Sequence, residues 1–149
     1  NQMYLEGKSI CFAGTQGTGK TYSSICILKA AIKNGLSAYY ITAADLLSEM
    51  TNYETCSATR NILKSRDVLV IDELDSRFFP SDGSKELFSS VYENIYRYRT
   101  HNSLPTILCT NETDDVLRPF FGPAVQSIRS LNSQYLIVYP IVGPDFRKK

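Results

Sequence analysis

The chain has 149 residues, a length that suits one domain able to bury a hydrophobic core without help from disulfides or metals. Hydrophobic residues make up 43% and charged residues 21%, and no apolar run is long enough to span a bilayer, which excludes an integral membrane protein with transmembrane helices. The net charge of +1 gives no overall attraction to nucleic acid, so any such binding must come from a local patch or from several subunits together.

The hydrophobic pattern alternates between strands and helices along the chain. In order, the first half predicts a strand at 9–13, a helix at 20–33, a strand at 38–42, a helix that starts at Thr42 or Ala43, a short helix at 58–64 and a strand at 68–72. The second half predicts a helix at about 85–100, a strand at 105–111, short helices at 113–117 and 123–131, and a strand at 135–141.

The fold class follows from this alternation. Strands that alternate with helices are typical of an α/β protein, and the continuous apolar run at 68–72 is typical of a parallel strand that is covered on both faces. We therefore expect a three-layer α/β sandwich around a mostly parallel five-stranded sheet. In such a sheet, ligands bind at the carboxyl ends of the strands.

A complete G-x-x-x-x-G-K-[ST] motif lies between the first predicted strand and the helix that follows it, which is the context this motif requires. Its residues are Gly14, Thr15, Gln16, Gly17, Thr18, Gly19, Lys20 and Thr21. The glycines let backbone N–H groups turn inward around phosphate oxygens, and the helix adds its positive dipole end at the same place. We expect Lys20 to reach the β- and γ-phosphates of a nucleotide, and the Thr21 hydroxyl to bind Mg²⁺.

Two adjacent carboxylates, Asp72 and Glu73, stand where the apolar strand at 68–72 ends. Charge in such an apolar setting needs a partner, and Mg²⁺ with its water shell supplies one. We expect Asp72 to hold the magnesium and Glu73 to orient and deprotonate the attacking water, a general-base role worth roughly 10²–10⁴-fold in rate. The alternative is a solvated strand end. The nearby Asp75 has no evident role.

Asn111 ends the predicted strand at 105–111 and, if this strand neighbours the acidic one, lies close to the two carboxylates. We expect its amide to hydrogen-bond the γ-phosphate or the attacking water. The alternative is a helix N-cap, a position that asparagine favours, and different atoms of Asn111 can fill both roles.

The order of the motifs GTQGTGKT, VLVIDELD, ILCTN and a lone arginine in AVQSIRSL resembles the core of the AAA+ ATPases. More narrowly, RNILKSRDVLVIDELD, followed by LFSSVYENIYRYRTHNSLPTILCTNET and a last strand ending in DFR, is similar to the DnaC-type loaders of replicative helicases, such as DnaC and DnaI. The IstB-like transposition helpers share this pattern. The resemblance covers nearly the whole chain and implies a P-loop ATPase that uses ATP and Mg²⁺, lacks a helical lid, and works in the cytoplasm of a bacterium, as a bacterial or phage protein.

The same resemblance implies roles for two polar residues. Asn111 corresponds to the residue that senses the γ-phosphate, and Arg129 to the arginine finger that one subunit offers to ATP bound by its neighbour. Such a finger is worth roughly 10³–10⁵-fold in rate, so activity is expected to depend on self-association. Arg118 is the rival finger, and an exposed helix arginine is the other interpretation of Arg129. Because loaders carry an additional N-terminal module, 1–149 is expected to be the C-terminal ATPase domain of a longer protein.

A contact with single-stranded DNA requires positive charge together with aromatic platforms. The candidates are Tyr96, Arg97 and Arg99, with Tyr98 and His101 beside them, and Phe78 and Phe79 in the loop after the acidic strand, which are candidates for a subunit contact as well. Tyr98 also belongs to the apolar face predicted for the helix at 85–100, together with Leu87. The alternative is an ordinary amphipathic helix in which Arg97 pairs with Glu93.

Three functions fit these features. The first is a helicase loader whose ATP-bound subunits assemble, engage single-stranded DNA, bind a replicative helicase and release it on hydrolysis. The second is an IstB-like helper, which requires duplex DNA and a transposase. The third is a P-loop kinase or nucleotide switch without DNA, which predicts monomeric activity that is indifferent to Arg129; the paired acids argue against the kinase.

Overall fold

A computed structural model describes residues 6–79, 81–113 and 124–147, without the side chains of Val125 and Arg129. Its elements are β1 (Ser9–Ala13), α2 (Lys20–Lys33), β2 (Ala38–Thr42), α3 (Ala43–Thr51), α4 (Cys56–Ser65), β3 (Val68–Leu74), the 3₁₀ helix η1 (Ser76–Phe78), α5 (Asp82–His101), β4 (Thr106–Thr110), α7 (Val125–Tyr135) and β5 (Leu136–Pro140). The helix predicted at 113–117 falls almost entirely outside the described residues. Within the described ranges, no helix has both the length and the apolar character needed to cross a bilayer.

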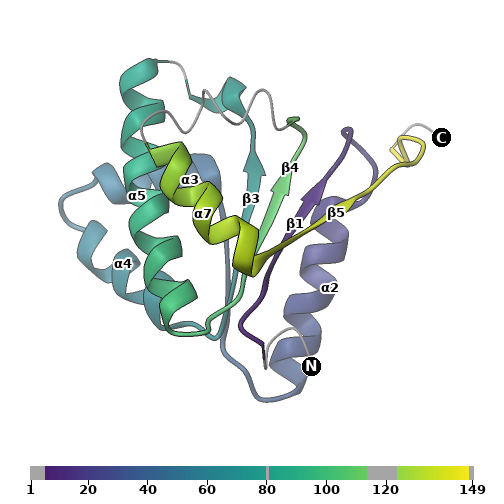
Figure 1. The fold of residues 1–149 in the computed structure, drawn as a ribbon, viewed down its shortest axis with the longest axis horizontal. Helices are drawn as coiled ribbons and strands as arrows, with labels where there is room; N and C mark the ends of the chain where they lie inside the picture. The colour runs from purple at the N-terminus through teal and green to yellow at the C-terminus, as the bar shows by residue number, and fades with distance from the viewer. Residues whose placement is uncertain (1–5, 80, 114–123, 148–149) are drawn as a thin grey trace.

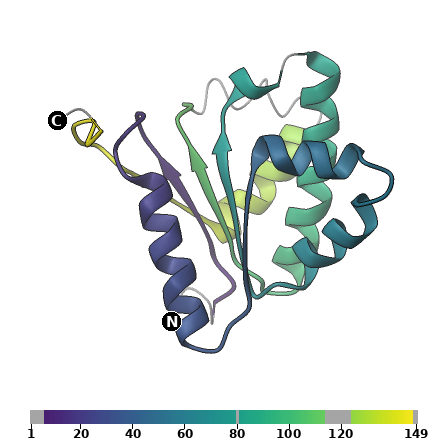
Figure 2. The ribbon, with the colours of Figure 1, turned by 180° about the vertical axis from the view of Figure 1, so that it is seen from behind.

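Helices cover both faces of a single parallel sheet (Figure 1). Its five strands lie in the order β2-β3-β4-β1-β5, and every neighbouring pair is parallel. Seen from behind, α2 lies on one side of the sheet, and α3, α4, α5 and α7 lie on the other (Figure 2). The predicted three-layer α/β sandwich is therefore confirmed, and the carboxyl ends of all five strands meet at one edge.

The side chains of β3 explain why its sequence is apolar without interruption. Val68 and Val70 pack with Leu28 of α2 on one face of the sheet. Leu69 and Ile71 belong to the larger core that α3, α5 and α7 build on the other face. Each such side chain contributes roughly 1.5–3 kcal/mol when it is removed from water, so both faces of β3 hold the layers together.

A β-bulge interrupts β3 at its carboxyl end. Register with β4 shifts between Ile71 and Leu74, where two residues of β3 lie opposite the single residue Cys109. Within the bulge, Glu73 has a φ of 55°, in the left-handed region that costs a residue other than glycine about 1–3 kcal/mol. Strain of this kind persists only where the surrounding structure enforces it, as the buried strand does here.

α5 begins three residues earlier than predicted, because serines cap its first turn. The Ser81 hydroxyl accepts a hydrogen bond from the backbone N–H of Ser84 at 3.2 Å, and the Ser84 hydroxyl accepts one from the N–H of Ser81 at 3.2 Å. This reciprocal capping box satisfies two donors, so the helix starts at Asp82. The sequence alone favours a loop here, because Gly83 and Pro80 are turn residues.

The inward face of α5 differs from the predicted one. Leu87 and Tyr98, expected inside, are 44% and 43% exposed, whereas Tyr96 and Arg99 are 1% and 0% exposed. Arg99 donates to the carbonyl oxygens of Leu63 (2.7 Å), Arg66 (2.8 Å), Asp67 (3.3 Å) and Pro105 (2.7 Å) and to the Thr106 hydroxyl (3.0 Å). Burial lowers the pKa of Arg99 to about 10, so it stays protonated at neutral pH. It therefore ties the end of α5 to the starts of β3 and β4.

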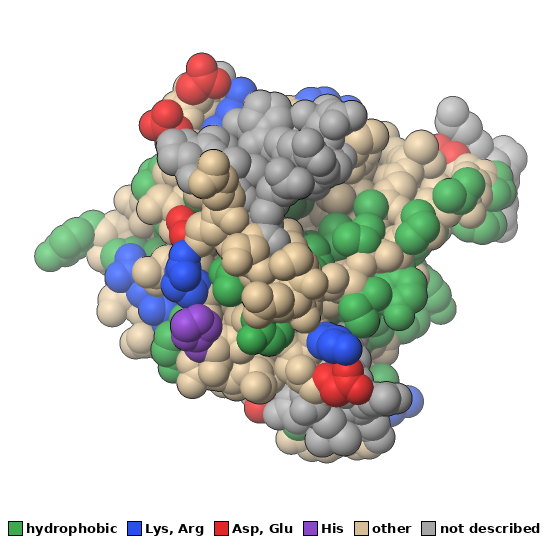
Figure 3. All heavy atoms as spheres, viewed as in Figure 1, with side chains coloured by type: hydrophobic (Ala, Val, Ile, Leu, Met, Phe, Trp, Pro, Cys, Tyr) green, Lys and Arg blue, Asp and Glu red, His purple; other side chains and the backbone are tan. Residues whose placement is uncertain are grey.

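β5 forms one edge of the sheet and remains largely uncovered. Ile137, Val138 and Tyr139 are 36%, 56% and 48% exposed. Figure 3 shows hydrophobic side chains gathered on the side of the molecule where β5 and α2 lie. The strand is only five residues long and ends in Pro140, two features that limit pairing at a sheet edge.

Candidate active site

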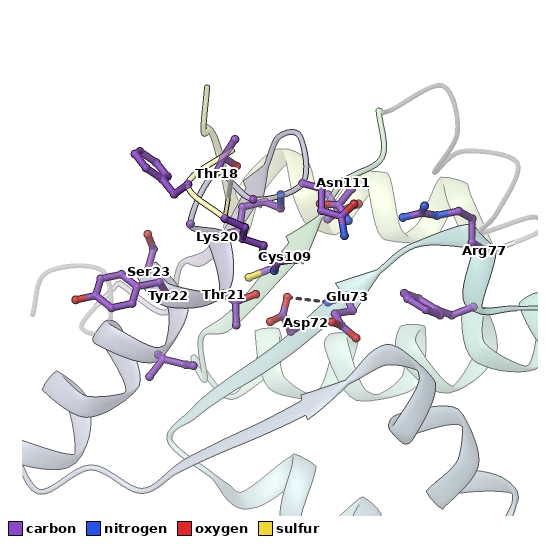
Figure 4. Close-up of a pocket in the computed structure, with 18 residues that line it drawn as sticks. Thr18, Lys20, Thr21, Tyr22, Ser23, Asp72, Glu73, Arg77, Cys109 and Asn111 are labelled. Carbon is purple, nitrogen blue, oxygen red and sulfur yellow. Dashed lines mark hydrogen bonds between the residues drawn. The ribbon is translucent and has the colours of Figure 1, made fainter. Parts of the chain in front are cut away.

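A pocket of about 710 Å³ opens at the carboxyl ends of β1, β3 and β4 (Figure 4). Of the residues predicted from the sequence, it is lined by Gln16, Gly17, Thr18, Gly19, Lys20, Thr21, Asp72, Glu73 and Asn111. The parallel sheet brings these residues together from three separate parts of the chain, at the place where ligands bind in this fold class.

The glycine-rich loop forms a cradle in front of α2. Lys20 is 7% exposed, and its Nζ donates to the carbonyl oxygens of Gly14 at 2.7 Å and Thr15 at 2.6 Å. Burial lowers the pKa of Lys20, an effect that the nearby Asp72 opposes. Gly19 has a φ of 96°, and a Cβ added there would meet no atom within 4 Å, so its backbone faces open space. The loop thus offers a cation and room for phosphate oxygens.

The two carboxylates of β3 both face the pocket because of the bulge. On a regular strand, successive side chains point to opposite faces of the sheet, so adjacent acids would not line one cavity. Asp72 is 2% exposed, and its Oδ1 accepts the backbone N–H of Glu73 at 2.7 Å. Glu73 is exposed at the pocket wall. In Figure 4, the Thr21 hydroxyl and the Asp72 carboxylate lie on the same side of the pocket. A hydroxyl and a carboxylate are oxygen donors of the kind that suits Mg²⁺.

Two neighbours of Asp72 were missed by sequence reasoning. The Tyr40 hydroxyl donates to Asp72 Oδ2 at 2.8 Å, and both burial and this bond raise the pKa of Tyr40. Cys109 lies in the pocket wall, where burial first and the Asp72 charge second raise its thiol pKa to about 12. The thiol is therefore protonated at neutral pH and serves as packing. Neither contact can be inferred without the register between strands.

The segment after β5 completes the wall on the side of the glycine-rich loop. The backbone N–H of Ile141 donates to the carbonyl of Ala13 at 2.7 Å, and that of Phe146 to the carbonyl of Gly17 at 3.1 Å. Phe146 and Arg147 line the pocket, and the charge of Arg147 contributes to the lowered pKa of Lys20. In the sequence, DFR had been interpreted only as the end of the last strand; its arginine is a second cation beside the phosphate cradle.

Substitution of Gly14 by alanine is expected to damage this wall. The added Cβ would lie 2.1 Å from the carbonyl oxygen of Ile141, so backbone must move, at a cost of about 1–3 kcal/mol. Gly83→Ala is the matched control: its Cβ has no neighbour closer than 4.0 Å and lies within α5, so a gain of about 0.4–1 kcal/mol is expected. Urea unfolding and ATP titration measure both; unchanged ATP affinity in Gly14→Ala would contradict the close approach.

The predicted arginine fingers are not located by the structure. Arg118 lies outside the described residues, and so does the side chain of Arg129, although its backbone belongs to α7. The N-cap role considered for Asn111 also concerns a helix beyond the described ranges. These roles stay predictions.

Part of the predicted DNA-binding set is wrong. Tyr96 and Arg99 are 1% and 0% exposed, so neither can reach a nucleic acid, because α5 turns this face to the core. Phe79 is likewise buried at 3%. Arg97 is exposed, and its Nη2 binds Glu93 Oε1 at 2.8 Å and the Ser127 hydroxyl.

A different basic and aromatic surface lies where α4 meets α5. The Nζ of Lys64 lies 4.8 Å above the ring of the exposed Tyr98, and His101 is exposed at the end of the same helix. Figure 3 shows basic side chains next to the histidine on this side of the molecule. These side chains combine a π-face with positive charge, the two properties expected of a single-stranded DNA contact.

Comparison with known proteins identifies the family of this chain. Residues 4–122 match the family of IstB-like ATP binding proteins. The chain belongs to this family. Among its relatives, the replicative helicase loader DnaC of Escherichia coli (strain K12) is 26% identical over 136 residues, covering 88% of this chain and 54% of the loader. An ATP-binding protein of insertion sequence IS5376 from Geobacillus stearothermophilus is 26% identical over 145 residues, covering 94% and 55%.

Solved structures share the fold of this IstB-like chain. The crystal structure of the DnaC helicase loader has a TM-score of 0.74 at 24% identity, covering 93% of this chain and 81% of that one. The replication initiator DnaA bound to AMPPCP and single-stranded DNA has a TM-score of 0.70 at 22% identity, covering 91% and 41%. The assignment to the AAA+ ATPases of the DnaC type is therefore confirmed, as are the P-loop ATPase fold and ATP as the nucleotide of the family. The chain spans about half the length of the curated relatives it matches.

Proposed function

We propose that the chain is the ATPase domain of a replicative-helicase loader, which binds MgATP, hydrolyses it where subunits meet, and engages single-stranded DNA. The observation that carries the proposal is the single pocket that unites Lys20, Thr21, Asp72, Glu73 and Asn111. The similarity to DnaC supports the loading function.

The residues of the pocket divide the work on the nucleotide. The glycine-rich loop and Lys20 bind the phosphates, and Thr21 with Asp72 holds the hydrated metal. Magnesium, when bound, neutralises charge that develops on the β- and γ-phosphates. Glu73 takes the proton of the attacking water, and Asn111 orients that water or the γ-phosphate. The hydrogen bonds that Tyr40 and the backbone of Glu73 donate to Asp72 keep its carboxylate in place for this role.

The site is completed by a neighbouring subunit in this proposal. α7 carries Arg129 in its first half, and an arginine supplied in trans stabilises the charge of the transition state. Arg118 is the alternative donor. Hydrolysis then depends on assembly, which lets DNA and the helicase control it.

Single-stranded DNA is proposed to bind across the surface formed by Lys64, Tyr98 and His101, with Arg97 at its border. A base can stack on the exposed ring of Tyr98 while Lys64 and Arg97 approach the phosphates. This assignment replaces the buried Tyr96 and Arg99 of the sequence-based prediction. The DnaA structure with single-stranded DNA supports such binding on the same fold.

The decisive experiment measures ATP hydrolysis as a function of protein concentration, with single-stranded DNA, with duplex DNA and without DNA. Hydrolysis per chain is expected to rise with concentration and with single-stranded DNA, and Arg129→Ala is expected to lose it by roughly 10³–10⁵-fold while still binding ATP. Arg118→Ala, tested in parallel, decides between the two fingers. Activity that ignores both concentration and DNA would leave a P-loop ATPase without the loader function.

An IstB-like transposition helper is the second candidate, favoured by the family match over residues 4–122 and by the relative from an insertion sequence. It predicts the opposite DNA preference. Stimulation by duplex DNA but not by single strands would therefore favour the helper over the loader.

A further inference from the structure

Side-chain hydrogen bonds join the ends of β3 and β4 and the turns that follow them. The Thr110 hydroxyl donates to the carbonyl of Leu74 at 2.7 Å. Two residues further along, the backbone N–H and the hydroxyl of Ser76 donate to Glu112 Oε1 at 3.2 and 2.9 Å. These hydrogen bonds fix the turn after β3 relative to the end of β4. The residue between them, Asp75, is therefore held in place.

Asp75 lies between the two links and holds an arginine. Asp75 is 1% exposed, and its carboxylate accepts hydrogen bonds from three groups of Arg77. Nε donates to Oδ1 at 2.9 Å and to Oδ2 at 3.0 Å, Nη2 donates to Oδ2, and the backbone N–H donates to Oδ1 at 3.0 Å. Asn111, at the end of β4, lines the same pocket as Arg77. Arg77 first, and Asn111 in addition, hold the pKa of Asp75 well below its usual range.

Arg77 lines the same pocket as Lys20 and Glu73. In Figure 4 its guanidinium points from η1 back toward Asn111. The bonds to Asp75 use Nε and Nη2, so the two N–H donors of Nη1 remain for another acceptor. The Arg77 side chain is 67% exposed, so its position is fixed by its hydrogen bonds to the buried Asp75 carboxylate and not by packing against other side chains.

We propose that Arg77 binds the γ-phosphate of the ATP held by its own chain, and that Asp75 is the positioning residue that aims the guanidinium there. This inference rests on the proposed binding of MgATP. In that proposal Asn111 lies near the γ-phosphate, and the Arg77 guanidinium, held by Asp75, points toward Asn111 within the same pocket (Figure 4). A planar guanidinium with two free donors matches two oxygens of one phosphate group.

The arrangement is more than a surface ion pair. Exposed pairs contribute little and need no buried partner, whereas a carboxylate removed from water must be satisfied by donors, as Asp75 is. Arg77 acts within the chain, unlike a finger supplied by a neighbour, so its effect is expected before any assembly. Because ADP lacks the γ-phosphate, its affinity should not depend on Arg77.

The test compares ATP and ADP affinities of Arg77→Gln and wild type by calorimetry, with Mg²⁺, at protein concentrations where the chain is monomeric. ATP binding is expected to weaken by about 10- to 100-fold, the loss of a charge-assisted hydrogen bond, with ADP binding changed less than about twofold. Lys85→Gln is the matched control, because Lys85 pairs with Asp82 at 3.1 Å outside the pocket. It should alter neither affinity.

Asp75→Asn tests the positioning role, since it keeps the size of the side chain and removes the charge that holds Arg77. It is expected to lower the ATP-to-ADP affinity ratio in the same direction, by less than Arg77→Gln. Arg77→Gln leaves the buried Asp75 carboxylate without its arginine, so the double variant Asp75→Asn/Arg77→Gln, which leaves no buried unpaired charge, tests the role of Arg77 if Arg77→Gln unfolds. If Arg77→Gln lowers the affinities for ATP and ADP equally, or lowers neither, this inference is overturned while the proposed function stands. A wild-type chain that binds neither nucleotide overturns the proposed function with it.

Discussion

Glu73→Gln is expected to lower ATP hydrolysis by roughly 10²–10⁴-fold while ATP affinity stays within a few-fold of wild type. The amide has the shape of the carboxylate, so the bulge and the pocket wall should persist, but it cannot accept the proton of the attacking water. Glu73 lines the pocket without being buried, which leaves the carboxylate free to meet that water. Phosphate release under single-turnover conditions, together with ATP titration, separates the chemical step from binding.

Glu86→Gln provides the control for this substitution. Glu86 is exposed on α5, away from the pocket, so the same chemical change there should leave hydrolysis at the wild-type rate. If Glu73→Gln hydrolyses ATP as fast as the control, another group is the general base, and the strained backbone at Glu73 requires a different explanation.

Arg99→Met is expected to bring the domain close to unfolding. The variant leaves four carbonyl oxygens and the Thr106 hydroxyl without the donor that Arg99 provides in a buried place, and each acceptor left unsatisfied costs about 1–3 kcal/mol. Even a loss of about 3–5 kcal/mol is a large part of the roughly 5–15 kcal/mol that stabilises a typical domain, and it is most of that free energy at the lower end of the range. Urea unfolding followed by circular dichroism measures the change.

Two companion variants make the Arg99 result specific. Arg97→Met removes an exposed arginine two residues earlier in α5, whose ion pair with Glu93 is worth up to about 1 kcal/mol. Arg99→Lys keeps the charge but has three donors on one nitrogen, so it cannot reach acceptors on both strands and should remain strongly destabilised. An unfolding midpoint for Arg99→Met equal to that of Arg97→Met would show that the buried bonds contribute little.

Elements with sharp local signals were predictable from sequence. The helix at 20–33 has the predicted bounds because the glycine-rich loop precedes it and Asn34-Gly35 ends it. β3 was predicted as a covered parallel strand because both of its faces are apolar, and the structure shows a helix layer on each side. The nucleotide pocket was predictable for the same reason, since parallel strands bring their carboxyl ends together.

The face of α5 was not predictable, because polarity alone does not decide which side chain turns inward. The pattern placed Leu87 and Tyr98 inside and left Arg99 outside. In the structure Arg99 is buried, since carbonyl groups at the starts of two strands need a donor there. This requirement arises from tertiary contacts between segments far apart in sequence, and no periodicity in the helix reports it.

Several site residues also depend on pairing between strands. Tyr40 reaches Asp72 because β2 and β3 lie in register, and both acids face the pocket because β3 is bulged against β4. Arg77 reaches the pocket through Asp75, for which the sequence suggested no role. Register and bulges are set by the packed sheet, so a linear pattern identifies the acids without showing how they are aimed.

The strand order also determines when the chain can complete its structure during synthesis. β1, which carries the glycine-rich loop, is made early but pairs only with β4 and β5. Ser9 and its hydrogen-bond partner Thr106 are 97 residues apart, so β1 waits until most of the chain has left the ribosome. β2 and β3 can pair well before that. The nucleotide pocket can therefore form only after β4 has been made. A translation product that ends before β4 would lack this pocket.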